Sequence, residues 1–206
     1  MISTFVWNML KPYYQSAEIE AGCDEAGRGC LAGPVFAAAV ILPADYYHKV
    51  LTDSKLLSEK IRNDLRKDIE ANAIDFAVTA IDNVKIDEIN ILQASVLAMH
   101  ISLDKLKQKF GFIIIDGNYF KPYEGIPHKT IVKGDSRFFS IAAASILAKT
   151  YRDEYMTTQH ERYPHYDWIN NKGYATASHR AAVMNYGLSP LRRRSFQLKE
   201  MQLGLF

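Results

Sequence analysis

The sequence lacks several features that mark particular classes of protein. Only two of its 206 residues are cysteines, Cys23 and Cys30, and they have no Cys-x-x-Cys spacing. This argues against a disulfide scaffold or a cysteine-built zinc site and fits a reducing compartment. Apolar runs such as Phe36–Leu42 are too short to span a bilayer. Met1–Leu10 has neither the cationic start nor the cleavage site of a secretory signal. We therefore expect a cytoplasmic protein without a membrane span.

The composition is that of an ordinary folded domain, but the charge is unevenly distributed. Apolar residues make up 48% and aromatic residues 12% of the chain, which excludes a disordered chain. The overall net charge of +2 combines −4 over residues 1–127 with +6 over residues 128–206, where Arg192, Arg193 and Arg194 are consecutive. Such a skew predicts that one side of the molecule meets a polyanion. The alternative is a charged surface that is merely solvated.

Strand and helix patterns are mixed along the chain. Short apolar or alternating stretches predict strands over Ile19–Asp24, Pro34–Leu42, Asp75–Ile81, Phe112–Ile115 and Lys129–Val132. Longer amphipathic stretches predict helices over Ser58–Asn72, Asp87–Phe110, Phe138–His160 and Ser178–Tyr186. This mixture predicts an α/β domain with a central sheet. We assign residues 1–160 to a catalytic domain and residues 161–206 to a C-terminal helical extension of the same structural unit.

Acidic residues follow three of the predicted strands. Each of these acids lies at or just after the end of a predicted strand, and they are Asp24 and Glu25, Asp116, and Asp135. Ligands of α/β sheets commonly bind at strand ends. Carboxylates are costly to bury unless they are paired or hold a metal. Oxygen ligands without His or Cys favour Mg²⁺ or Mn²⁺, and two such ions roughly 4 Å apart can support phosphodiester cleavage. The alternative is that each acid is simply a strand-end residue.

The segment after the first acids contains two glycines around an arginine, Gly27-Arg28-Gly29. Neighbouring residues of a regular strand point to opposite faces. Asp24 and Glu25 therefore share a metal site only if the strand bends, which the glycines permit. They also allow close approach to a ligand, and the guanidinium can bind phosphate in a fork. On its own, the Gly-Arg-Gly segment could equally be a plain turn.

Together these motifs resemble the bacterial ribonuclease HII family, the type 2 ribonucleases H. The matching segments run in order along nearly the whole chain and are Asp24–Gly29, Leu31–Val35, Asp53–Lys55, Asn90–Ala94, Asp116–Asn118, Lys133–Ser136, Ser140–Lys149 and Lys172–Thr176. The resemblance implies a ribonuclease H-like fold with a mixed five-stranded sheet flanked by helices. It also implies hydrolysis of RNA paired to DNA and cleavage 5′ to ribonucleotides embedded in duplex DNA, leaving a 3′-hydroxyl and a 5′-phosphate.

The resemblance also implies roles for individual residues. Asp24, Glu25, Asp116 and Asp135 match the catalytic acids, the first three being the firmer metal ligands. The segment Gly27-Arg28-Gly29 matches the one that reads the ribose 2′-hydroxyl, and Tyr174 the tyrosine that stacks on the neighbouring deoxyribose. Contacts to the nucleic-acid backbone are implied for Lys55, Ser145 and Lys149. Asp153 shares one helix face with Ser145 and Lys149 and is interpreted as an ion-pair partner only.

Two positions depart from the family pattern. Position 30 is Cys30 where the family more often has proline, and position 175 is Ala175 where proline or glycine is more usual. Neither change removes a catalytic group. The sister family, ribonuclease HIII, carries an extra N-terminal domain and a different residue between the glycines. Only 23 residues precede Asp24 here and the middle residue is Arg28, so the ribonuclease HII interpretation is preferred.

The last five residues, Gln202-Leu203-Gly204-Leu205-Phe206, resemble the peptide by which many bacterial replication and repair proteins bind the DNA sliding clamp. Gln202, Leu203, Leu205 and Phe206 supply the amide and the apolar anchors of such a docking peptide. The alternative is that these side chains cover an apolar patch of the same molecule. Two other functions stay open for the whole chain: another carboxylate-metal nuclease, or a non-catalytic nucleic-acid-binding module. A monomer is expected.

Overall fold

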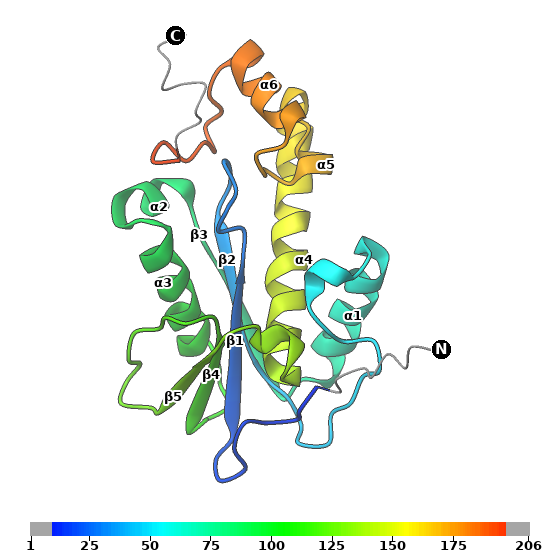
Figure 1. Cartoon of the computed structure of the whole chain (residues 1–206), viewed down its shortest axis with the longest axis vertical. Coiled ribbons are helices and arrows are strands. Elements are labelled where there is room, and N and C mark those ends of the chain that lie inside the picture. Colours follow the sequence, from blue (N-terminus) through cyan, green and yellow to red (C-terminus); the bar gives the residue numbers. More distant parts are fainter. Residues whose placement is uncertain (1–9, 197–206) are drawn as a thin grey trace, which may run out of the picture.

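A mixed five-stranded sheet forms the centre of the fold (Figure 1). The structure is a computed structural model and describes residues 10–196. The strands lie in the order β3-β2-β1-β4-β5. β1 is antiparallel to β2 and parallel to β4, while β3 is antiparallel to β2 and β5 is parallel to β4. Their bounds are β1 Glu20–Ala26, β2 Val35–Ile41, β3 Asp75–Ile81, β4 Phe112–Asp116 and β5 His128–Ile131. The predicted α/β class with a mixed five-stranded sheet is confirmed.

Helices cover both faces of the sheet, with α2 and α3 on one face and α1 and α4 on the other (Figure 1). Alternating residues of β1 and β2 feed a separate apolar core on each face, as the period of two in a strand requires. The α-helices are α1 Glu59–Asn72, α2 Asn83–Ile89, α3 Ile91–Asp104, α4 Phe139–Arg162, α5 Trp168–Asn171 and α6 Ala177–Tyr186. The 3₁₀-helices are η1 Ser54–Leu56, η2 Gly134–Ser136 and η3 Pro164–Tyr166. Within residues 10–196, no helix is long and apolar enough to cross a bilayer.

Helix α4 lies unusually close to β1. The alanines Ala142–Ala144 are fully buried and leave little side-chain bulk between helix and sheet. A Cβ placed on Gly22 of β1 would lie 2.5 Å from the Ser140 backbone carbon of α4, a distance that real Cβ atoms do not show. Glycine at position 22 is therefore required for this contact, which fixes β1 and α4 against each other.

The C-terminal helices continue the same unit. A third apolar cluster joins Leu31 and Ala32 of the β1–β2 loop and Met156 of α4 to Trp168 of α5 and Val183 of α6. The sequence boundary between residues 160 and 161 falls in the last turn of α4, which ends at Arg162. The segment that follows α4 therefore packs directly on the loop after the first acidic strand.

The prediction of one helix over Asp87–Phe110 is wrong, because the chain breaks at Asn90. This residue has a φ of 65° and its side chain accepts hydrogen bonds from the Leu92 and Gln93 N–H groups, so it ends α2 and caps α3. The apolar periodicity continues across the break and hides it. Beyond Asp104 the Lys107 and Gln108 N–H groups donate to the Asp75 carboxylate of β3 instead of continuing the helix. The tail Gln202–Phe206 lies outside the described residues.

Candidate active site

Asp24 and Asp116 lie side by side on neighbouring parallel strands. Cys23 of β1 is paired with Ile115 of β4, so the residues after them occupy adjacent positions on the same face of the sheet, the face covered by α4. Asp24 is only 5% exposed, and the Gly134 N–H donates to Asp116 Oδ1 over 2.7 Å. The hydrogen bond from Gly134 connects β4 to η2, which carries the next acid.

Asp135 lies on η2, directly after Gly134, and is 4% exposed. Burial and, to a smaller extent, the negative charges of Asp116 and Asp53 together raise the pKa of Asp135 to about 6. Lys55 opposes the shift. The loop after β5 thus adds a third carboxylate to the pair contributed by β1 and β4.

Asp24 is buried between β1 and α4. Burial raises its pKa well above the ordinary range, and the charges of Glu25 and Asp116 add to the effect. The hydroxyl of Ser145 on α4 opposes this shift and lowers the pKa of Asp24. The Ser54 and Ser145 hydroxyl oxygens are 2.9 Å apart and share a hydrogen bond in which either can be the donor. The Asp24 side chain therefore interacts with both the sheet and the covering helix.

Glu25 does not share the face of Asp24 in this structure. Regular pairing with β2 continues to Ala26, which lies opposite Phe36, and the chain turns only at Gly27, where φ is 94°. The bend that the sequence interpretation requires between the two acids is absent. Glu25 Oε1 instead lies 3.1 Å from the Arg28 guanidinium. Burial raises the pKa of Glu25, the charge of Arg28 lowers it, and the charge of Asp116 raises it.

Within residues 10–196, no three His, Cys, Asp or Glu side chains are arranged to hold a metal ion. Each acid is instead engaged locally: Asp24 accepts from the Glu25 N–H over 2.7 Å, Asp116 from Gly134, and Glu25 is paired with Arg28. The donor set nevertheless fits a hard divalent cation. It consists of carboxylates without His or Cys, and burial, together with the charge of Asp116, raises the pKa values of Asp24, Glu25 and Asp135.

Lys55 lies within electrostatic reach of this acidic cluster. It is held by η1, where the Asp53 carboxylate accepts from the Lys55 N–H over 2.8 Å. Burial lowers the pKa of the Lys55 ammonium, but the charges of Asp53, Asp24 and Asp135 outweigh it and raise the pKa. The side chain therefore stays cationic beside the acids.

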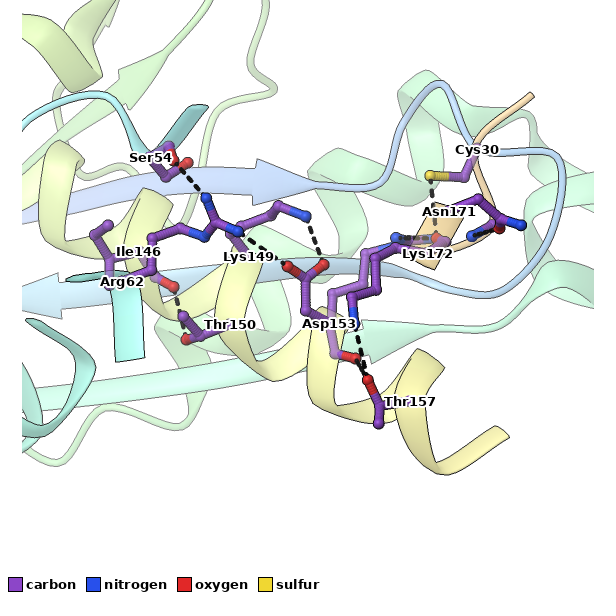
Figure 2. Close-up of polar contacts among 12 residues, drawn as sticks. Cys30, Ser54, Arg62, Ile146, Lys149, Thr150, Asp153, Thr157, Asn171 and Lys172 are labelled. Atoms are coloured by element: carbon purple, nitrogen blue, oxygen red, sulfur yellow. Dashed lines mark hydrogen bonds and ion pairs between the residues drawn. The ribbon is translucent and has the colours of Figure 1, made fainter. Parts of the chain in front are cut away.

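A second cation on α4 is paired with an acid. Lys149 Nζ lies 2.5 Å from Asp153 Oδ1, and Arg62 of α1 lies 3.7 Å from Asp153 Oδ2. Figure 2 shows Asp153 between these two cations. The prediction that Asp153 is an ion-pair partner is confirmed. Burial lowers the pKa of Lys149 in spite of Asp153.

Tyr174 follows Gly173 in a loop that contacts the segment after β1. The Leu31 N–H donates to the Gly173 carbonyl over 2.8 Å, and Lys149 Nζ lies 5.8 Å from the centre of the Tyr174 ring. The residue is 39% exposed, and burial of its hydroxyl raises the pKa to about 12. The structure thus brings Tyr174 beside the loop that contains Gly27-Arg28-Gly29.

A neutral histidine holds the Tyr174 backbone. Trp168 Nε1–H donates to His179 Nε2 over 3.2 Å, so the proton of the imidazole sits on Nδ1. That nitrogen donates to the Tyr174 carbonyl, 2.9 Å away. Burial lowers the pKa of His179, which favours this neutral form. The sequence does not reveal this role, because a histidine in a short helix has no distinctive pattern.

Three arginines of the basic C-terminal part of the chain are buried and do not form a surface for a polyanion. Arg192 and Arg193 belong to the basic run that predicts contact with a polyanion, yet both are buried, as is Arg152 of α4. Their guanidinium groups donate to backbone carbonyls. A run of arginines has the same appearance in the sequence whether it faces solvent or the interior, so no local signal marks them.

The arrangement of sheet and helices defines the ribonuclease H class of folds. The RNase HII in the PCNA:RNase HII complex from Archaeoglobus fulgidus superposes with a TM-score of 0.72 at 22% identity, over 88% of this chain and 96% of that chain. Bst-RNase HIII in complex with Mn²⁺ superposes with a TM-score of 0.73 at 21% identity, over 90% of this chain and 69% of that chain. At these identities the likeness establishes the fold.

The sequence relationships establish the family. The Ribonuclease HII family pattern matches residues 21–199. A curated Ribonuclease HII from Bacteroides fragilis is 56% identical over 199 residues, which are 96% of this chain and 99% of the relative. The chain belongs to the ribonuclease HII family. It is therefore a ribonuclease H, an endoribonuclease that acts on RNA paired to DNA.

Proposed function

We propose that this enzyme also cuts 5′ to ribonucleotides embedded in duplex DNA, leaving a 3′-hydroxyl and a 5′-phosphate. Asp24, Glu25 and Asp116 hold two divalent ions, Mg²⁺ or Mn²⁺, and Asp135 completes the catalytic acids. The activity serves the removal of misplaced ribonucleotides and the clearance of RNA primers. The observation that carries the proposal is that Asp24 and Glu25 of β1 and Asp135 of η2 all lie within electrostatic range of Asp116 on β4, and that burial first and neighbouring negative charge second raise the pKa values of these three acids.

That electrostatic situation favours cation binding. Clustered carboxylates at neutral pH repel one another, and a divalent cation relieves the repulsion more effectively than Lys55 alone. When bound, the ions supply an acidified water for attack and positive charge for the leaving oxygen. Glu25 would have to leave Arg28 to help hold an ion, and the Arg28 guanidinium would then be free to bind a phosphate of the substrate.

The remaining residues position the nucleic acid. Lys55 on η1 and Lys149 on α4 provide cationic contacts to the phosphates next to the cut. Ser145 holds the Asp24 carboxylate and offers its own oxygen to the backbone. These contacts carry no sequence information, which suits an enzyme that acts wherever a ribonucleotide occurs.

Recognition of the sugar is assigned to the loop and the tyrosine. The backbone of Gly27-Arg28-Gly29 contacts the 2′-hydroxyl, which is the group that separates RNA from DNA. The Tyr174 ring stacks on the adjacent deoxyribose, where a second 2′-hydroxyl would be crowded. The contact between Leu31 and Gly173 supports this assignment because it holds the two reading elements next to each other.

A cleavage assay on a duplex with one ribonucleotide tests the proposal, with Mg²⁺ and with Mn²⁺ and with EDTA as the metal-free control. We expect one cut 5′ to the ribonucleotide, a product with a 5′-phosphate, and no cleavage in EDTA. An all-DNA duplex should stay intact and a uniform RNA–DNA hybrid should be cut. Cleavage of the all-DNA duplex would indicate a different carboxylate-metal nuclease, and binding without cleavage a non-catalytic module.

The terminal peptide Gln202–Phe206 is proposed to bind a DNA sliding clamp. The pattern of its amide and apolar residues supports this, as does the Archaeoglobus fulgidus protein of the same fold, whose structure is a complex with PCNA. The Asp87 carboxylate of α2 accepts from the Arg194 and Ser195 N–H groups over 2.8 and 2.9 Å. This contact fixes the chain just before the tail to the body of the protein.

Deletion of Gln202–Phe206 is expected to abolish clamp binding while leaving the melting temperature and the cleavage of naked duplex unchanged. Titration calorimetry with a bacterial sliding clamp and a thermal melt on the same samples measure the two effects. A full-length protein with no affinity for the clamp, together with a lower melting temperature after deletion, would show instead that the tail covers an apolar patch of this chain.

A further inference from the structure

Two arginine side chains are fully enclosed behind the loop that follows β1. Arg152 of α4 and Arg193 of the C-terminal segment are each 0% exposed. No ion pair formed within residues 10–196 includes either of them. An unpaired buried charge costs several kcal/mol, so these guanidinium groups require strong compensation from other neighbours.

The compensation comes from backbone carbonyls. Arg152 donates to the carbonyls of Pro34, Ala32 and Lys172 over 3.0, 3.1 and 2.8 Å. Arg193 donates from Nε to the Gly33 carbonyl and from Nη1 to the Arg28 carbonyl, both over 2.9 Å. The acceptors thus lie in only two places: the loop that begins with Gly27-Arg28-Gly29, and the residue two positions before Tyr174. A guanidinium holds several N–H donors in a fixed planar fork, so one side chain can bind carbonyls of separate chain segments at the same time.

The loop also touches these side chains directly. A Cβ on Gly27 would lie 2.0 Å from Arg152 Nε, so the guanidinium occupies the space where any larger residue would place its side chain. The same guanidinium lies 5.7 Å from the centre of the Tyr174 ring. Arg152 is therefore in contact with both elements that read the sugar, and Arg193 supports the middle of the first one through the Arg28 carbonyl.

We propose that Arg152 and Arg193 are positioning residues that fix the Gly27–Gly29 backbone relative to the Tyr174 ring and so determine how strictly the enzyme selects a single ribonucleotide. This inference rests on the proposed function. Neither side chain reaches the substrate. A displacement of about 1 Å in such a frame costs up to roughly a hundredfold in rate, and it affects the substrate that depends on both reading elements most.

Arg193→Lys is the test, because lysine keeps the charge but cannot bind the Gly33 and Arg28 carbonyls together. We expect the ratio of kcat/KM on a single-ribonucleotide duplex to kcat/KM on a uniform hybrid to fall by about tenfold. Arg192→Lys is the matched control. Arg192 is also buried, at 4% exposure, and donates to the Leu31, Arg193 and Phe196 carbonyls but not to the Arg28 or Gly33 carbonyl. Its ratio should equal that of the unaltered enzyme.

The substrate ratio separates positioning from general damage. A merely structural role lowers both activities in parallel with the melting temperature and leaves the ratio unchanged, and that result would overturn the proposal. So would an equal loss of ratio in Arg192→Lys. If Arg193→Lys does not fold, Arg193→Gln is measured in the same way. An unaltered enzyme that fails to cut the single-ribonucleotide duplex contradicts the proposed function itself, whereas an unchanged ratio beside an active unaltered enzyme contradicts only this inference.

Discussion

Asp24→Asn is expected to abolish cleavage, with kcat lower by more than about a thousandfold, while binding to the duplex stays within about threefold of the unaltered protein. The amide is a poor ligand for a hard cation, and the phosphate contacts proposed for Lys55 and Lys149 do not involve the Asp24 side chain. Single-turnover cleavage with saturating Mg²⁺, and fluorescence anisotropy with the same duplex, measure the two quantities. Near-normal turnover at saturating Mg²⁺ would remove Asp24 from the catalytic acids.

The same substitution is expected to stabilise the metal-free protein by about 3 °C in melting temperature, since about 1 kcal/mol corresponds to roughly this shift in a chain of this size. Burial and the charges of Glu25 and Asp116 raise the pKa of Asp24 in the folded state. The folded protein therefore binds the proton more tightly than the unfolded chain does, and the ionised carboxylate destabilises the fold at neutral pH. This penalty fades as the pH falls through the raised pKa of Asp24, so the gain in melting temperature should shrink as the pH is lowered.

A matched control for the stability measurement is Asp64→Asn, which removes an exposed carboxylate of α1. It should change neither the melting temperature nor cleavage. Addition of Mg²⁺ should raise the melting temperature of the unaltered protein and of this control by linkage, but not that of Asp24→Asn. A metal-free Asp24→Asn protein that melts below the unaltered one would contradict the claim that ionised Asp24 destabilises the fold.

Tyr174→Ala is expected to lower cleavage at a single embedded ribonucleotide by roughly 5- to 150-fold, which corresponds to the loss of a stacking contact of about 1–3 kcal/mol. Cleavage of a uniform hybrid should fall much less, because such a substrate offers no deoxyribose at the junction. Steady-state kcat/KM on the two duplexes measures the effect. Tyr174→Phe keeps the ring and should keep the discrimination, so an equal loss in both variants would assign the effect to the hydroxyl instead of stacking.

The sequence predicts the sheet and the place of the acids because both depend on short-range patterns. The strand Asp75–Ile81 has the predicted bounds, and the helix over Ser58–Asn72 begins one residue later because Ser58 is its N-cap, with Oγ accepting from the Ile61 N–H. Acids directly after buried strands are visible in the sequence in the same way. Asp24 and Asp116 become neighbours because β1 and β4 pair in parallel, and that pairing is known only from the structure.

Features that depend on contacts between distant parts of the chain could not be predicted from the sequence. The break at Asn90 leaves the apolar rhythm intact, so only its positive φ reveals it. The burial of Arg193 depends on carbonyls of residues 28 and 33, far away in the sequence. The separation of Asp24 from Glu25 depends on how far β1 stays paired with β2, which glycines after the strand do not decide.

The close contact of Gly22 with Ser140 joins catalysis to global stability. Asp24 stands two residues beyond Gly22 on β1, while Ser145 and Lys149 follow Ser140 on α4. The groups proposed for bond cleavage and those proposed to hold the phosphates therefore share the most tightly packed part of the core. Heat inactivation of the enzyme is therefore expected to coincide with cooperative melting of the whole domain and not to precede it.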